Sequence, residues 1–415
     1  MMEKTQYRYV IVGGGLAGGK ACQGIREEDP EGSIVLISEE DHPPYHRPPL
    51  SKGFLKNEAG LEKVYLQGED NFQEMDVDLI LGQAVTAIST DENSITMENG
   101  VKIEYHKLLL ATGGRAISLP LWGSDLDQMF TLRTIEDSRA IKQAAGEASR
   151  ALVMGGSFIG AEVAASLAQM GLEVIEIFPE DRLLEHVVPE ELSQFLEERF
   201  SKNKIRVLSN TVAEGLEGEQ SVQRVALDNG EHIPVDFVVM GVGIKLNSEL
   251  AVEAGLEVDD EDGSVVVDSF LKTSDQDIYA AGDLTVWPDP RSENMIHAEH
   301  WDVARQQGLT AGRNLGGGKL KYSSLPYFFS DVLDLSFEVW GTLDGWDETV
   351  RRGKLEDGSA AYFYFRDGQL TGVLAVNRPE GEREAMKTLP AGGPAYHRVA
   401  EKLRDETFDL QQLIS

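Results

Sequence analysis

Cysteine is nearly absent from this chain. The 415 residues contain a single cysteine, Cys22. No intramolecular disulfide and no Cys-x-x-Cys centre can form, which excludes redox enzymes that relay electrons through a cysteine pair. A cysteine sulfenate needs only one reactive thiol, and it is excluded because we expect Cys22 to be a packed core residue. Cys22 falls within a helix that follows a glycine-rich turn, so we expect it to pack in the core rather than to react.

Basic residues are also scarce. The chain has 38 lysines and arginines against 71 aspartates and glutamates, which gives a formal net charge of −33. No nucleic acid is expected as a partner, since phosphate backbones need a positive footprint. The charge indicates a surface adapted to solubility, with a specific acidic docking face as the alternative.

Long apolar runs are missing as well. No run approaches the roughly 20 apolar residues that a membrane span requires, so no span is expected. The opening Met1–Gln6 leads directly into a predicted strand without a secretory signal, which predicts a cytoplasmic protein. Eight histidines are scattered singly, so no metal site is expected. An apolar content of 41% and a charged content of 26% are typical of globular domains.

What the chain does contain is one phosphate-binding pattern that occurs twice. The predicted strand Tyr9–Val12 runs into the glycine turn Gly13–Gly18, and the predicted strand Ala151–Met154 runs into Gly155–Gly160. Each turn places a helix N-terminus, with its unpaired N–H groups, where it can hold a dinucleotide pyrophosphate. Two such turns indicate one protein that holds two dinucleotides, the arrangement needed to pass a hydride from a nicotinamide to a flavin.

The first dinucleotide-binding domain is predicted to be discontinuous. Its second strand is Ser33–Ser38, and Lys107–Ala111 is a later strand that leads to an exit turn. The strand Asp277–Asp283 fits best as the closing strand of this domain, and the helix His300–Asn314 follows it. Proline fixes φ and removes N–H donors, so His42–Lys52 is expected to be an extended loop without helix.

The second domain repeats this plan, with its own second strand at Glu173–Phe178. Beyond it, Leu335–Trp340, Ala360–Phe365 and Leu370–Val376 alternate apolar with polar residues, as in an antiparallel sheet. We therefore predict an α/β protein with two Rossmann-like dinucleotide-binding domains and a C-terminal α+β domain. The predicted boundaries are 1–117 and 245–325 for the first domain, 118–244 for the second and 326–415 for the third.

Acidic residues at strand ends are candidates for sugar binding. Glu39 could bind the ribose of an adenosine, or be a solvated loop acid. Asp283 could accept hydrogen bonds from the ribityl chain of a flavin, cap a helix, or do both. In the second domain the charge of Glu180 would repel a 2′-phosphate, which favours NADH over NADPH. Glu176 competes for this role from inside the strand, and Arg182 could instead accommodate the phosphate.

Lys52 and Glu162 are the main catalytic hypothesis. Lys52 ends the proline-rich loop, and Glu162 lies on the first turn of the second domain's helix. A pair between two cofactor sites would hold a cation near the redox nitrogen of a flavin, where it stabilises the anionic reduced ring. A structural salt bridge between domains explains the same pattern equally well.

Other residues carry two interpretations each. His300 could sit against the edge of the flavin or nicotinamide, or serve as a core or capping residue. The aromatic run Tyr327–Phe329 could be core packing or a wall over the flavin. Ser157 replaces the glycine that lets the backbone come closest to a pyrophosphate, so we expect a slightly looser site there.

The chain resembles the FAD-dependent, NADH-oxidising ferredoxin reductase family, which includes putidaredoxin reductase and apoptosis-inducing factor. These are pyridine nucleotide-disulfide oxidoreductases that lack the redox cysteines, and the resemblance covers essentially the whole chain. It is carried by Gly13–Gly18, Arg47–Lys52, Ala111–Gly113, Leu132–Thr134, Gly155–Glu162, Ala281–Asp283, Glu299–Trp301 and Gln307–Gly308. The departures are Ser157, Phe329 in place of a common tryptophan, and Lys245–Asn247 in place of a turn proline.

The resemblance implies a glutathione-reductase-like arrangement with FAD and NADH as cofactors. FAD would be lined by Gly13, Gly15, Ala17, Gly18, Glu39, Arg47, Lys52, Val85, Ala111, Thr112, Gly113, Arg133, Gly282, Asp283, Glu299, His300 and Trp301. NADH would meet Gly155, Gly156, Ser157, Phe158, Ile159, Gly160, Glu162, Glu180 and Gly243, with Glu299 and His300. The catalytic residues would be Lys52, Glu162 and His300.

The expected reaction is hydride transfer from NADH to FAD, then release of single electrons to an iron–sulfur or rubredoxin-type carrier. Ferredoxins are typically acidic, and a protein of charge −33 should repel them unless a basic patch such as Arg351–Lys354 overrides this. The alternative interpretation of Arg351–Lys354 is a solvated hairpin. Two alternatives stay open: an NADH-gated redox switch like apoptosis-inducing factor, and an NADH:quinone or NADH:oxygen oxidoreductase. A monomer or a homodimer is expected.

Overall fold

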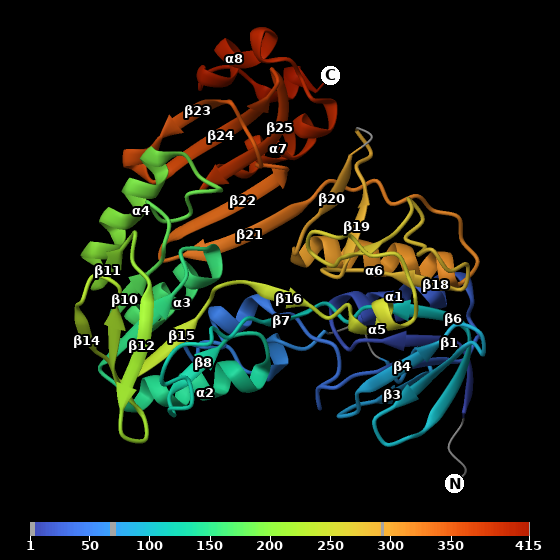
Figure 1. Ribbon diagram of the computed structural model, residues 1–415. Helices are drawn as coiled ribbons and strands as arrows, with labels where there is room; N and C mark the ends of the chain where they lie inside the picture. The colour runs from blue at the N-terminus through green and yellow to red at the C-terminus, as the bar shows by residue number, and fades with distance from the viewer. Residues whose placement is uncertain (1–4, 67–71, 292–293, 415) are drawn as a thin grey trace. The chain divides into compact units, whose positions relative to one another are not determined.

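The structure, a computed structural model, describes residues 5–66, 72–291 and 294–414 (Figure 1). The chain divides into two compact units. Unit 1 consists of Met1–His46, Leu61–Arg115 and Lys245–Pro326, and unit 2 of Arg47–Gly60, Ala116–Ile244 and Tyr327–Ser415. Residues 1–4, on which the expected absence of a secretory signal rests in part, lie outside the described residues. Across the described part of the chain, no helix has both the length and the apolar character that crossing a membrane requires.

A mostly parallel sheet forms the centre of unit 1, in the order β3-β2-β1-β6-β5-β4, with β18 paired to β6. Its strands are β1 (Gln6–Val12), β2 (Ile34–Ile37), β3 (Val77–Ile80), β4 (Val85–Ser89), β5 (Ser94–Met97), β6 (Lys102–Leu110) and β18 (Ile278–Ala280). Helix α1 (Leu16–Glu28) connects β1 to its parallel neighbour β2, which is the unit that the glycine turn predicts. Strand β18 pairs in parallel with β6, so the returning segment closes this sheet, as predicted.

Helices α1 and α6 (Trp301–Leu315) of unit 1 pack backbone against backbone. A Cβ on Gly308 would lie 2.3 Å from the carbonyl oxygen of Ala17, and one on Gly312 would lie 2.2 Å from that of Ala21. Only glycine allows this approach. The start of α1, which follows the first glycine turn, is therefore fixed against the helix that begins after His300.

Unit 2 combines a parallel sheet, in the order β11-β10-β9-β15-β8, with an antiparallel sheet, in the order β21-β22-β25-β24-β23. The first sheet and its helices are β8 (Met129–Thr131), β9 (Arg150–Met154), β10 (Glu173–Ile177), β11 (Ile205–Leu208), β15 (Phe237–Met240), α2 (Ile135–Glu147), α3 (Phe158–Gln169) and α4 (Glu190–Lys202). The second comprises β21 (Tyr327–Val332), β22 (Leu335–Gly341), β23 (Glu348–Lys354), β24 (Ser359–Arg366) and β25 (Gln369–Val376), followed by α7 (Glu380–Gly392) and α8 (Tyr396–Arg404). The fold is thus α/β with a second Rossmann-like sheet and a C-terminal α+β part. The three-domain division itself stays a prediction.

Short elements complete the chain. Small sheets are formed by β12 (Ala213–Gly218), β13 (Val222–Leu227) and β14 (His232–Pro234), by β17 (Val265–Val266), β19 (Thr285–Pro288) and β20 (Met295–His297), and by β7 (Gly114–Ala116) with β16 (Ile244–Leu246). Helix α5 spans Glu249–Glu253. Pro48–Ser51 forms the 3₁₀ helix η1, so the prediction of a helix-free loop before Lys52 was wrong. The first N–H groups of a helix have no intrahelical partner, so prolines at its start lose no hydrogen bond.

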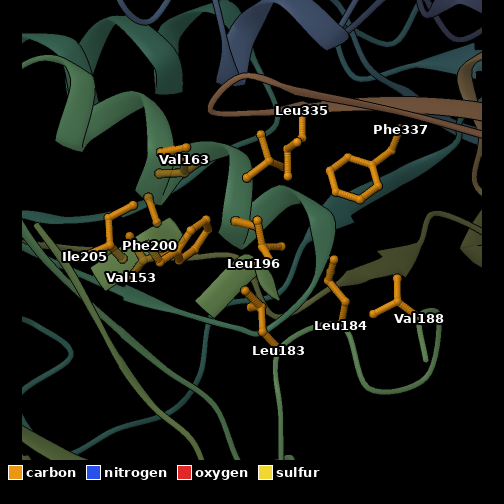
Figure 2. Close-up of a cluster of buried hydrophobic side chains, with 14 of the residues drawn as sticks. Val153, Val163, Leu183, Leu184, Val188, Leu196, Phe200, Ile205, Leu335 and Phe337 are labelled. Atoms are coloured by element: carbon orange, nitrogen blue, oxygen red, sulfur yellow. The ribbon is translucent and has the colours of Figure 1, made fainter. Parts of the chain in front are cut away.

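One hydrophobic core in unit 2 joins the parallel sheet, its helices and the antiparallel sheet. Figure 2 shows Leu335 and Phe337 of β22 in one cluster with Val163 of α3 and Leu196 of α4. None of these four side chains is more than 1% exposed. Burial of such side chains stabilises by roughly 1.5–3 kcal/mol each. Helix α3, which carries Glu162, is therefore held firmly against the β21–β22 strand pair.

Candidate functional site

Lys52 and Glu162 form a largely buried ion pair in unit 2. The Nζ atom of Lys52 lies 2.7 Å from Oε1 of Glu162, and the two side chains are 17% and 3% exposed. The Lys52 ammonium also lies over the ring of Phe329, 5.5 Å from its centroid. The structure thus brings together the two residues of the main catalytic hypothesis and the residue that departs from the family's tryptophan.

Two buried serines complete the surroundings of Glu162. The Oγ of Ser51 donates a 2.5 Å hydrogen bond to Oε2, and the Oγ of Ser330 donates a 2.6 Å hydrogen bond to Oε1. Sequence reasoning missed this role, because a hydroxyl group carries no pattern of its own. The available signal was position: Ser51 precedes Lys52, and Ser330 follows Phe329.

The first glycine turn, in unit 1, has the form that a dinucleotide needs. Gly13 has φ +118°, and a Cβ there would lie 2.2 Å from the carbonyl oxygen of Ala111. A Cβ on Gly18 would lie 2.1 Å from the carbonyl oxygen of Gly13, whereas one on Gly15 would meet nothing within 4 Å. Within the described residues, no side chain caps α1 at Gly15. The helix N–H groups therefore face an open approach, which fits a pyrophosphate.

Of the other residues expected at FAD, Glu39 and Ala111–Gly113 lie at the carboxyl ends of strands of this sheet, whereas Val85 lies at the start of a strand. Glu39 is exposed after β2, Val85 begins β4 half-buried, and Ala111–Gly113 directly follows β6. Thr112 is fixed by Asn247: its hydroxyl donates to the Asn247 carbonyl at 2.7 Å, and the Asn247 amide donates back to the Thr112 carbonyl at 3.1 Å. Ligands of open α/β sheets bind at the carboxyl ends of the strands.

The turn after β18 holds Gly282 and Asp283. Gly282 has φ +86° and donates its N–H to Oε1 of Gln307 at 2.8 Å. Gln307 is 0% exposed, and its Nε2 finds no acceptor among the described residues, so this amide could donate to a bound group. Gln307 was expected only as part of a motif with Gly308 and not as a site residue. Strand β19 follows Asp283, so the alternative of a helix-capping aspartate was wrong.

His300 occupies the N-cap position of α6 and is half-buried. Its neighbour Trp301 donates its indole N–H to Nδ1 of His46 at 3.1 Å. Glu299 is exposed and contacts His297, 3.5 Å from Oε1 to Nε2. Burial opposes the charge of His297, but hydrogen bonds to Glu299 and to the Thr285 carbonyl outweigh it and raise the pKa of His297.

Arg47 and Arg133 lie together in unit 2, whereas most of the other residues expected at FAD belong to unit 1. The guanidinium of Arg47 donates to the carbonyl oxygen of Arg133. The Arg133 N–H donates to Oδ2 of Asp137 at 2.8 Å, beside the capping box in which Thr134 starts α2. A helix cap thus fixes the backbone that holds Arg47.

The second glycine turn repeats the geometry of the first. Gly155 has φ +120°, and a Cβ on Gly160 would lie 2.0 Å from the Gly155 carbonyl oxygen. Ser157 is the N-cap of α3, and its hydroxyl donates a 3.4 Å hydrogen bond to the carbonyl oxygen of Gly241. Phe158 packs against Phe328 with the ring centroids 5.3 Å apart. Ile159 is 46% exposed, so the start of α3 reaches the surface, and Gly243 adopts the left-handed φ of +103° that favours glycine.

The acid expected at the NADH ribose, Glu180, has one buried oxygen without a hydrogen-bond partner among the described residues. Glu180 follows β10 and is half-buried, and the oxygen concerned is Oε2. The competing Glu176 is 0% exposed inside β10, so it does not reach the surface where a ribose would bind. Arg182 donates from Nη1 to Oε1 of Glu185 at 2.9 Å and from Nη2 to its carbonyl at 3.0 Å. The arginine that could accept a 2′-phosphate is therefore engaged by a carboxylate.

The expected basic patch Arg351–Lys354 is wrong for its central residue. Arg352 is 2% exposed and donates to Oε1 of Glu382 at 2.8 and 3.0 Å. Arg351 contacts Glu191, 2.6 Å from Nη1 to Oε2. Successive residues of a strand point to opposite faces, which turns Arg352 into the domain. It cannot serve as a docking charge.

Residues 7–308 match the family model described as pyridine nucleotide-disulphide oxidoreductase, and residues 327–414 match the model described as reductase C-terminal. A ferredoxin–NAD⁺ reductase component of 3-phenylpropionate/cinnamic acid dioxygenase from Photorhabdus laumondii is 32% identical, over 92% of this chain and 95% of that protein. Putidaredoxin reductase from Pseudomonas putida is 31% identical, over 98% and 96%.

A solved ferredoxin reductase from Rhodopseudomonas palustris superposes with a TM-score of 0.92 at 31% identity, over 99% of this chain and 100% of that one. The two glycine turns fit the FAD and NAD(H) that this family uses, and the absence of a cysteine pair agrees with the ferredoxin reductase branch. The chain therefore belongs to the pyridine nucleotide-disulphide oxidoreductase family, as an NADH-dependent flavoprotein of the putidaredoxin reductase type.

Proposed function

We propose that this protein transfers electrons from NADH to an iron–sulfur protein of the ferredoxin type, or to a rubredoxin, in the cytoplasm. The similar proteins support the class of acceptor, since they are named ferredoxin–NAD⁺ reductase components and putidaredoxin reductase. The chain itself supports an external acceptor. Its single cysteine, Cys22, is buried in α1, so no internal dithiol can take the electrons.

The buried Lys52–Glu162 pair carries the proposal. FAD, when bound, supplies a redox centre that accepts a hydride and releases electrons one at a time. Lys52 would hold a positive charge at this centre, where it stabilises the reduced form. A charge that is fixed by Glu162 before the reaction needs no reorganisation during it.

The residues expected at each cofactor form the rest of the proposed site. The glycine turn Gly13–Gly18 and the carboxylates Glu39 and Asp283 would hold FAD, while Gly155–Gly160 and Glu180 would hold NADH. Hydride transfer depends on placement more than on acid–base groups, so these residues bind and orient. His300, the N-cap residue of α6, would lie at the edge of the flavin and nicotinamide rings.

Anaerobic titration of the purified holoprotein with NADH tests the proposal. We expect NADH to bleach the flavin absorption rapidly. Addition of a ferredoxin or rubredoxin should then restore the absorption as rapidly as NADH removed it. NADPH, titrated in parallel, should bleach the flavin much more slowly. A bleached state that persists in the presence of these carriers would contradict the proposal and favour an NADH-gated redox switch. Reoxidation by quinone or oxygen alone would instead favour an NADH:quinone or NADH:oxygen oxidoreductase.

A further inference from the structure

The carboxylate of Glu162 is held on both of its oxygens by hydroxyl groups. Ser330 donates to Oε1 at 2.6 Å and Ser51 donates to Oε2 at 2.5 Å. Lys52 reaches the same Oε1 at 2.7 Å. The side chains of Ser51, Glu162 and Ser330 are all buried, at 3%, 3% and 1% exposure. This is a closed polar cluster in which each group has a charged partner.

The chemistry of these groups fixes the direction of the hydrogen bonds. An ionised carboxylate only accepts, so both hydroxyls must donate to it. Each serine has one proton to give. Among the described residues, Ser51 has one other acceptor, the carbonyl oxygen of Pro48, which is 3.4 Å away and therefore much farther than Glu162. Hydrogen bonds to a charged acceptor are roughly twice as strong as neutral ones.

Two donors, one on each oxygen, determine where the lysine charge lies. With Ser51 on Oε2 and Ser330 on Oε1, rotation of the carboxylate about its terminal bond would break both hydrogen bonds, so they hold Oε1 toward Lys52. A lysine ammonium on its four-carbon stem has many rotamers and no fixed geometry of its own. The position of the Lys52 charge is therefore set by Glu162, and that of Glu162 by the serines.

The serines come from different elements of unit 2. Ser51 ends η1, directly before Lys52, and Ser330 lies in the middle of β21. Across the strand pair, Ser330 faces Phe337 of β22, whose ring packs against Phe158 at the start of α3 with centroids 5.4 Å apart. The antiparallel sheet thus reaches Glu162 through a hydroxyl and supports the helix that carries it.

We propose that Ser51 and Ser330 are positioning residues for the reaction, which hold the Glu162 carboxylate so that Lys52 keeps its charge at one place. This inference rests on the proposed function, in which that charge stabilises the reduced flavin. It gives the C-terminal antiparallel sheet a role in the chemistry through Ser330. Neither serine would touch a reacting atom, and both would act through Glu162 on Lys52.

The test compares holoenzyme variants by the midpoint potential of the flavin, titrated with dithionite, and by the rate of bleaching with NADH. The variants are Ser51→Ala, Ser330→Ala, their combination and Ser330→Thr, each also made with Lys52→Met. Ser193→Ala is the matched control. Ser193 is also buried, at 0% exposure, but its hydroxyl donates to the carbonyl oxygen of Leu183, 2.6 Å away. Urea unfolding of every variant separates loss of stability from loss of positioning.

We expect the double alanine variant to bleach about tenfold more slowly than the wild type, and to have a lower midpoint potential. Ser330→Thr keeps the hydroxyl, so its bleaching rate and midpoint potential should stay close to those of the wild type. Ser193→Ala should change only the stability. In the Lys52→Met background the serine substitutions should change neither quantity further.

Equal effects of the serine substitutions with and without Lys52 would overturn the proposal, as would an unchanged potential in the double variant. The potential is measured without NADH, so it tests the serines independently of the proposed reaction. A wild type that NADH does not bleach would refute the proposed function alone, while the potentials still decide the role of the serines.

Discussion

The carboxyl group of Glu176 lies against Gly160 of the second glycine turn. Its Oε1 is 3.2 Å from the position that a Cβ on Gly160 would occupy. Glu176 is 0% exposed, and neither carboxyl oxygen has a hydrogen-bond partner among the described residues. Burial, and then the negative charge of Glu197, raise the pKa of Glu176 well above its usual range. A raised pKa favours the protonated, neutral form of this carboxyl beside the turn.

This acid predicts a pH-dependent stability. The folded state binds the Glu176 proton more tightly than the unfolded state, so the free energy of unfolding falls as pH rises from about 4.3, the ordinary glutamate pKa, toward the folded pKa. The loss amounts to up to about 1.4 kcal/mol per pH unit within that window. Glu176→Gln removes it. We expect the variant to gain stability relative to the wild type between pH 5 and pH 8, in urea unfolding at each pH.

A control for this effect lies on the same strand. Glu173 begins β10 and is exposed, so Glu173→Gln should leave the pH dependence of unfolding as it is in the wild type. If Glu176→Gln and the wild type showed parallel stability profiles across this range, Glu176 would not be protonated in the fold.

Glu162→Gln should destabilise unit 2 through the charge that it leaves behind. The Lys52 side chain is only 17% exposed and would lose its carboxylate partner, and both serine hydroxyls would lose a charged acceptor. Removing one partner of a buried pair typically costs about 3–5 kcal/mol. We expect a loss at the lower end of this range in urea unfolding, because Lys52 is partly exposed.

The matched control is an exposed ion pair of the same unit. Arg150 Nη2 lies 3.0 Å from Oε2 of Glu173, and the side chains are 38% and 64% exposed. Exposed pairs contribute roughly 0–1 kcal/mol, so Glu173→Gln should have little effect on stability. A cost for Glu162→Gln no larger than that of the control would show that the Lys52–Glu162 pair is not held in solution.

The parallel sheets of the two units could be predicted from the sequence because the patterns that indicate them are local. A buried strand, a glycine turn and a helix follow one another at Tyr9–Val12 and again at Ala151–Met154, and β18 was placed correctly as the returning strand. Strand β21 was missed, because Tyr327, Phe328 and Phe329 are all partly buried and show no alternation. Strand β23 was not predicted either: Arg351–Lys354 was interpreted as a basic patch or a solvated hairpin, because two adjacent arginines give no sign of which one is buried.

The candidate site was predictable only where a motif names the residue. Lys52 and Glu162 stood out by residue type and by place, and the structure pairs them. Ser51, Ser330 and Gln307 did not, since their importance comes from contacts between segments far apart in the chain. The 3₁₀ helix η1 was missed because proline was treated as a helix breaker, although it is compatible with a first turn.

Cofactor preference should depend on Glu180 and on the engagement of Arg182. Glu180→Ala removes the charge that would repel a 2′-phosphate, and Glu185→Ala releases the guanidinium that Glu185 now binds. We expect the double variant to gain about tenfold in kcat/KM for NADPH and to lose activity with NADH, because the site then offers a cation and no ribose acceptor. Steady-state kinetics with both cofactors measures the change.

Asp181 supplies the comparison for this prediction. It is exposed and lies between Glu180 and Arg182, so Asp181→Ala removes one negative charge at nearly the same place. The NADPH:NADH ratio should change little. If Asp181→Ala shifted the ratio as far as the double variant does, general charge rather than the two named contacts would set the preference.

Arg352 should be essential for the stability of the C-terminal part of the chain. Besides Glu382, its guanidinium donates to the carbonyl oxygens of Leu403, Asp405, Glu406 and Phe408, which ties the segment after α8 to β23. Burial opposes the charge of Glu382, but hydrogen bonds from Arg352 and Arg378 outweigh it and lower the pKa of Glu382. This group therefore stabilises the fold above its ordinary pKa, and the contribution is lost as pH falls through the lowered value.

Arg352→Met should cost about 3 kcal/mol or more at pH 7, because it leaves Glu382 with a weaker set of partners and four carbonyl groups without their donor. We expect the segment after residue 403 to become sensitive to limited proteolysis at the same time. Arg351→Met, which removes a 41% exposed partner of Glu191, is the control and should cost less than about 1 kcal/mol. The difference between the two variants should shrink in acid, since protonation of Glu382 removes the charge that Arg352 binds. Equal losses for the two arginines at pH 7 would mean that the contacts of Arg352 add nothing beyond those of a surface ion pair.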